Sequence, residues 1–177
     1  MYKVLTVLMT FLLLPSIASA QPTGIADDWG PWVFLMGQWE GDVGGQPGQG
    51  AGEFSFYFDL DGKVMVRKSR ADFPATKDRP AFSHEDLMVI YLQPGKSASR
   101  RAIYFDNEDH VIEYTAEFSA ERGTFTFLSE AAPSAPRQRL TYTREGTDRV
   151  SIKFAIAPPD KPDAFSTHVE GSAHRKN

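Results

Sequence analysis

Short runs of alternating apolar and polar residues recur along most of the chain, and residues that favour turns separate them. In the run 53–58, three phenylalanines share one face, as in a strand with one buried side. Asp61-Gly62 follows soon after and predicts a hairpin turn, because glycine adopts positive φ at little cost. The same pattern predicts about ten strands, at residues 39–43, 53–58, 63–69, 87–91, 101–105, 110–118, 124–128, 137–143, 150–156 and 164–174.

The links between these strands are short, which predicts antiparallel pairing of each strand with the next one along the chain. So many sequential strands favour closure into an all-β, antiparallel up-and-down barrel, with a two-sheet sandwich as the structural alternative. Apolar residues crowd the stretch 29–35, just before the first strand, and suit a short N-terminal helix. No helix is expected after residue 36.

The first twenty residues have the pattern of a secretory signal peptide. Lys3 is their one charged residue, an apolar run covers 4–14, and Ala18-Ser19-Ala20 is a small-residue cleavage site. The apolar run is too short for a membrane-spanning helix. We therefore expect a signal peptide at 1–20, one barrel domain at 21–177 without a transmembrane anchor, and a periplasmic or secreted location.

The composition narrows the classes of partner. The 177 residues include no cysteine, so the exported domain needs a hydrophobic core in place of disulfides. The formal net charge of −4, spread along the chain, forms no basic stripe for nucleic acid. The expected partner is a small molecule. The oligomeric state does not follow from the sequence.

The segment Gly37-Gln38-Trp39-Glu40-Gly41, placed after a short helix and before a strand meander, resembles the opening of the calycins. This group includes lipocalins, fatty-acid-binding proteins and nitrobindins, and the segment is also similar to bacterial exported lipocalin-like domains of unknown function. The resemblance implies that Trp39 closes one end of the barrel. It also implies that Arg175, beyond the last strand, lies across the indole ring as a lid.

Fatty-acid-binding proteins hold a carboxylate with arginine and tyrosine on late strands, and this resemblance implies ligand-binding roles here for Arg139, Thr141 and Tyr142, with Phe56 and Phe127 in the lumen. Alternation leaves the orientation open. Arg139 and Thr141 share one face of their strand, and Tyr142 lies on the other. If Tyr142 faces inward, the arginine is solvated.

Nitrobindins carry a haem-ligating histidine early in the last strand, and His168 occupies a similar place, so the resemblance makes it the candidate iron ligand and haem the candidate cofactor. Alternation opposes this role, because the more core-like residues of the strand, such as Val169, lie on the other face. A second, weak candidate is a metal site formed by His84-Glu85-Asp86 with His110 and Asp106 or Asp109.

The sequence gives an enzyme little support, because it has no cysteine nucleophile and no Gly-x-Ser-x-Gly elbow. The function predicted is binding of a hydrophobic or amphipathic small molecule in the lumen of an exported barrel. Two alternatives stay open: a nitrobindin-like protein with haem-dependent activity, and a structural or partner-binding barrel without ligand.

Overall fold

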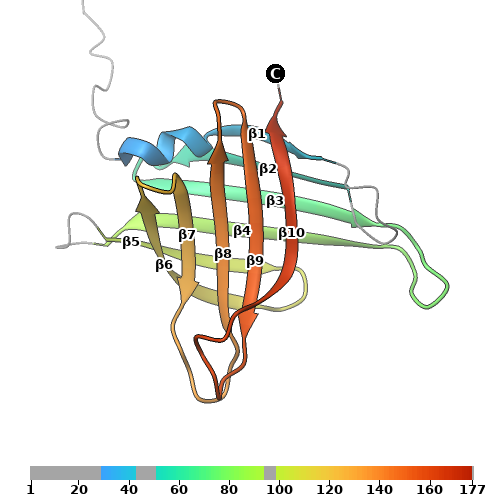
Figure 1. Cartoon of the computed structure of the whole chain (residues 1–177). Coiled ribbons are helices and arrows are strands. Elements are labelled where there is room, and N and C mark those ends of the chain that lie inside the picture. Colours follow the sequence, from blue (N-terminus) through green and yellow to red (C-terminus); the bar gives the residue numbers. More distant parts are fainter. Residues whose placement is uncertain (1–28, 43–50, 94–98, 177) are drawn as a thin grey trace, which may run out of the picture.

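The computed structural model describes residues 29–42, 51–93 and 99–176, which form a closed antiparallel β-barrel (Figure 1). The predicted signal peptide and the glycine-rich loop at 44–50 lie outside the described residues. The strands are β1 (Gly37–Gly41), β2 (Ala51–Asp59), β3 (Val64–Phe73), β4 (Phe82–Leu92), β5 (Arg100–Asp106), β6 (Val111–Ser119), β7 (Thr124–Ser129), β8 (Arg137–Glu145), β9 (Arg149–Ala157) and β10 (Ser166–Arg175).

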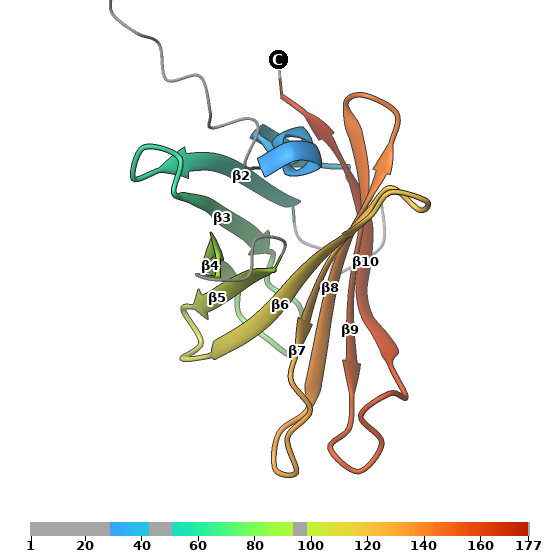
Figure 2. The same ribbon diagram turned by 90° about the vertical axis from the view of Figure 1, so that its left-hand side faces the viewer.

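Each strand pairs with its neighbour in the chain, and pairing of β1 with β10 closes the barrel. The predicted all-β barrel is therefore confirmed, and the sandwich alternative is wrong. In Figures 1 and 2, β2 to β5 run across the direction of β7 to β10, so the barrel is strongly flattened and twisted. Closure is narrow, because β1 pairs with only the last part of β10, at positions 173–175. Within the described chain, residues 166–171 of β10 pair with β9 alone, and the Ser172 carbonyl oxygen accepts from the Asp42 amide at 2.8 Å.

Two details of the β2 to β4 region differ from the sequence prediction. The hairpin turn lies one residue earlier: Leu60 and Asp61 both have positive φ (49° and 54°), and the Gly62 amide donates to the Asp59 carbonyl oxygen at 3.0 Å. The Asp59 carboxylate accepts from the Leu60 amide at 2.7 Å and supports this conformation. Gly62, the next residue, also has a positive φ, 78°, which glycine adopts more readily than a residue with a side chain.

β3 and β4 are also longer than predicted and continue to Phe73 and from Phe82. These two residues pair in register, and their rings stack at 4.6 Å. The prediction began β4 only at Leu87, because the earlier inward-facing positions hold His84 and Asp86 in place of apolar residues. Polar residues inside a barrel conceal the alternation on which sequence reasoning depends.

A six-residue 3₁₀ helix, η1 (Gly30–Leu35), precedes β1 and confirms the predicted short helix. It covers the end of the barrel where the odd-numbered strands begin, which we call the capped end (Figure 1). The Trp29 indole donates to the Gly62 carbonyl oxygen at 2.8 Å, and Trp32 packs on Phe125 at 5.2 Å. The opposite end, where the even-numbered strands begin, is called the open end. No helix of the described chain is long and apolar enough to cross a membrane.

Candidate functional site

The two ends of the barrel are packed differently. At the capped end, the interior is filled by aromatic side chains with at most 1% exposure, namely Trp29, Trp32, Trp39, Phe56, Phe125 and Phe127. Toward the open end, inward-facing apolar residues of β6, β9 and β10 keep accessible surface: Ile112, Ile152 and Phe154 are half-buried, and Val169 is 56% exposed. Gly171 pairs with Ile152 on the inward face, and a Cβ added there would meet no atom within 4 Å. The lumen is therefore unfilled at this height.

A buried ion pair lies between the filled and unfilled parts. Arg67 of β3 donates from Nη1 to the Asp86 carboxylate of β4, and their side chains are only 9% and 5% exposed. The guanidinium carbon lies 5.6 Å from the centre of the Phe54 ring and 5.9 Å from that of Tyr142. Arg67 Nε and the Tyr142 hydroxyl are buried and form no hydrogen bond of good geometry, although the two side chains lie close enough for Arg67 to act on the pKa of Tyr142.

A second polar group continues from this pair to the rim. His84 Nδ1 lies 2.8 Å from Glu108, and since a carboxylate only accepts, the imidazole donates there. Nε2 of the neutral ring then accepts from the Tyr104 hydroxyl at 3.1 Å. The same hydroxyl lies 3.3 Å from Asp106 Oδ2, which also contacts His110 Nδ1 at 2.9 Å. The resulting chain connects two histidines through a tyrosine and an aspartate. We call it the rim network.

Burial and neighbouring charges set the protonation of these groups. Burial raises the pKa of Tyr142 to about 12, and Arg67 acts in the opposite direction. Burial, with the charges of Asp86 and Asp106, raises the pKa of Tyr104 well above its ordinary value. Burial alone would raise the pKa of Asp106, but hydrogen bonds from His110 and Glu108 outweigh it and hold the value below the ordinary range. At neutral pH both tyrosines therefore stay protonated and Asp106 is ionised.

Comparison with known proteins supports the fold and does not assign a family. No protein-family model matches the chain, and no curated protein matches it significantly. Among solved structures, the chain is similar to the crystal structure of Rv2717c from M. tuberculosis, with a TM-score of 0.58 over 88% of this chain and 99% of that one. Sequence identity is 13%, so this likeness shows a shared fold alone.

The structure divides the predicted ligand-binding residues between two faces. Tyr142, Phe56 and Phe127 face inward and are at most 1% exposed. Arg139 and Thr141 lie on the outer face, since they alternate with the buried Tyr142. The Arg139 guanidinium packs over the Phe165 ring at 4.1 Å outside the barrel. Neither Arg139 nor Thr141 contributes to the lumen.

The predicted lid residues lie together at the capped end. The Arg175 guanidinium carbon is 4.3 Å from the centre of the Trp39 ring. Arg175 also donates to the Met36 carbonyl oxygen and, at 2.8 Å, to that of Phe34. Trp39 is fully buried, and its indole donates to the Leu35 carbonyl oxygen at 2.8 Å. Arg175 thus joins the last strand to the helix and to the first strand.

His168 lies where β10 has a register shift, between Thr167 and Val169. This irregularity breaks the alternation that placed His168 outside. The imidazole lies 6.1 Å from the ring of Phe154, an inward-facing residue at the open end. Haem ligation by His168 stays a prediction.

The histidines and acids proposed as a weak metal site gather at the same end. Among the described residues, however, no group of three or more His, Asp or Glu side chains is arranged to hold a metal ion.

The sequence did not lead to the roles of Arg67 and Tyr104. A usable signal was present: Arg67 lies in phase with Met65, and Tyr104 with Ala102, so alternation places both inward.

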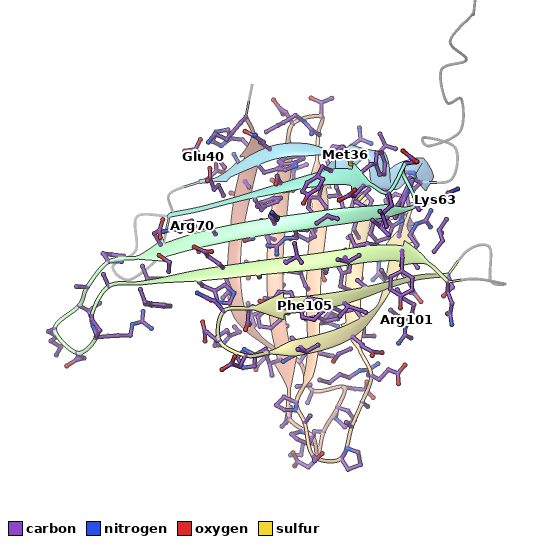
Figure 3. The ribbon with its side chains drawn as sticks, turned by 180° about the vertical axis from the view of Figure 1, so that it is seen from behind. Met36, Glu40, Lys63, Arg70, Arg101 and Phe105 are labelled. Atoms are coloured by element: carbon purple, nitrogen blue, oxygen red, sulfur yellow. The ribbon has the colours of Figure 1, made fainter. Side chains whose placement is uncertain are left out.

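A hollow of about 670 Å³ lies across β1 to β5. Its lining includes Phe105 and Arg70 of the outer face (Figure 3). It also includes the inward-facing residues Trp39, Phe54, Asp86 and Asp106. Arg70 already pairs with Glu85 and, at 2.8 Å, with Asp72. Arg70 therefore brings no unpartnered charge to this hollow.

Proposed function

We propose that the protein binds a small hydrophobic or amphipathic molecule in the lumen at the open end. One observation supports this most: the inward-facing apolar residues there are only partly buried, and Gly171 faces open space. Exposed apolar surface inside a barrel is costly in water, and a ligand that covers it gains that free energy. The filled capped end gives the site a closed floor.

The signal-peptide pattern at 1–20 adds that the barrel acts after export, in the periplasm or outside the cell. A helix-capped meander and the contact of Arg175 with Trp39 agree with the resemblance to calycins, whose members hold ligands inside their barrels. We infer a carrier or scavenger of a small molecule, without nucleic acid as partner.

Substitution of Gly171 tests the location of the site. Phenylalanine at this position has room for its Cβ and fills the lumen, whereas Glu170→Phe places the same ring one residue away on the outer face. Native mass spectrometry of the purified proteins, followed by denaturing extraction, should show a bound small molecule on the wild type and on Glu170→Phe, and none on Gly171→Phe. A bare mass in every preparation, or a ligand retained by Gly171→Phe, would contradict lumenal binding.

Haem is one candidate for this ligand, because the shift in β10 brings the His168 imidazole beside Phe154 at the apolar open end. Neutral imidazole is a common axial ligand of haem iron. Haemin should therefore be added to the wild type and to the same variants, and the absorption spectrum recorded. Haem ligation predicts a shifted Soret band that Gly171→Phe and His168→Ala both abolish. Without such a shift, the haem alternative is discarded and the amphipathic ligand remains.

A further inference from the structure

We propose that the open end selects an amphipathic molecule with an uncharged, oxygen-bearing head group, such as a hydroxyl or carbonyl, and discriminates against a carboxylate. This inference rests on the proposed lumenal binding and specifies the chemical class of the ligand. It also departs from the fatty-acid-binding comparison, in which an arginine grips the carboxylate.

The arginine of this lumen is already occupied. Among the described inward-facing residues of the open end, Arg67 is the one with a permanent positive charge, and Asp86 accepts from its Nη1. The rings of Phe54 and Tyr142 flank the guanidinium, and the residue is only 7% exposed. A bidentate grip on a ligand carboxylate needs two free, reachable N–H groups of the fork. Arg67 cannot offer them, because Nη1 bonds Asp86 and burial between the two rings keeps the rest of the fork out of a ligand's reach.

The rest of the polar wall is acidic. It carries three carboxylates, those of Asp86, Asp106 and Glu108, and one arginine, Arg67. Asp106 is buried, with 4% of its side chain exposed, and hydrogen bonds from the His110 and Glu108 amides stabilise its negative charge. A ligand carboxylate placed here would lose its hydration and face like charge at low dielectric.

An uncharged oxygen suits the same wall. Arg67 Nε and the Tyr142 hydroxyl are too deeply buried to meet a ligand, so the partly exposed Tyr104 hydroxyl is the polar group within its reach. Nearer the rim, Tyr104 holds one proton between two acceptors, His84 at 3.1 Å and Asp106 at 3.3 Å. A ligand hydroxyl can accept a hydrogen bond from Tyr104 and donate one to whichever of His84 and Asp106 Tyr104 does not bond. It does so without adding a charge. The apolar wall of Ile112, Phe154 and Val169 then receives the hydrocarbon chain.

The test compares two probes with the same chain, 1-decanol and decanoic acid, titrated calorimetrically into the mature protein at pH 7.5. We expect a Kd for the alcohol at least tenfold lower than for the acid. A plain apolar pocket would also prefer the alcohol, so Asp106→Asn provides the decisive comparison. Removal of this buried charge should raise the affinity for decanoic acid several-fold and narrow the gap.

The outcomes separate the inference from the proposed function. If the acid binds as tightly as the alcohol, or if a folded Asp106→Asn variant leaves the gap unchanged, the head-group inference is overturned while lumenal binding stands. If neither probe binds, or if Gly171→Phe binds both like the wild type, lumenal binding fails and the inference fails with it. The Glu170→Phe variant should behave as the wild type.

Discussion

The buried Arg67–Asp86 pair should dominate the energetics of the lumen. Replacement of Asp86 by leucine keeps the approximate volume but leaves Arg67 as an unpaired cation, at a site where its side chain is 9% exposed. Loss of one partner of a buried ion pair costs about 3–5 kcal/mol. Burial works against the charge of Arg67, and the variant loses the Asp86 charge that helps to raise its pKa. Arginine still keeps its proton in proteins, so Arg67 cannot escape this cost by deprotonation. With a urea m-value of about 2 kcal/mol/M, the unfolding midpoint should fall by about 2 M.

Two further variants make the measurement decisive. The double replacement Arg67→Met with Asp86→Leu removes both charges, and it should recover stability to within about 1 kcal/mol of the wild type. Arg70→Ala breaks an ion pair with Glu85 on the outer face, where the side chains are 49% and 53% exposed (Figure 3), and should cost far less than Asp86→Leu. The reasoning is refuted if Asp86→Leu costs no more than Arg70→Ala, or if the double variant is no more stable than the single one.

Two predictions concern other parts of the barrel. Arg175→Ala should cost about 2–4 kcal/mol in urea unfolding, because it removes the contact with Trp39 and donors to two carbonyl oxygens, and unchanged stability would rule out the lid. Asp106 has a lowered pKa when folded, so its contribution is complete above the unfolded pKa of about 3.9 and is lost as pH falls through the folded value. Asp106→Asn should therefore flatten the decline in thermal stability below about pH 4, and a decline as steep as that of the wild type would contradict this assignment.

The sequence by itself determined the strands and their order. Alternation of large apolar residues with polar ones marks a half-buried strand wherever the buried face is apolar, as at Phe54 and Phe56 or at Phe125 and Phe127. Short turns between such strands restrict each to pairing with its neighbour, and this number of strands closes into a barrel. The apolar residues at 29–35 also predicted the short helix, and the resemblance to calycins implied that Arg175 lies against Trp39. The two residues meet because β1 pairs with β10.

Tertiary structure alone decided which residues reach the lumen. A strand has two faces, and only packing shows that Tyr142 lies inside and Arg139 outside. The register shift at His168 puts Thr167 and Val169 on opposite faces, although simple alternation gives them the same one. Alternation with Met65 indicates that Arg67 faces inward, but nothing in the sequence shows that Asp86 is its partner. The pairing of β3 with β4 buries them together and turns them into one ion pair, because two opposite charges stabilise each other where a single one would be too costly.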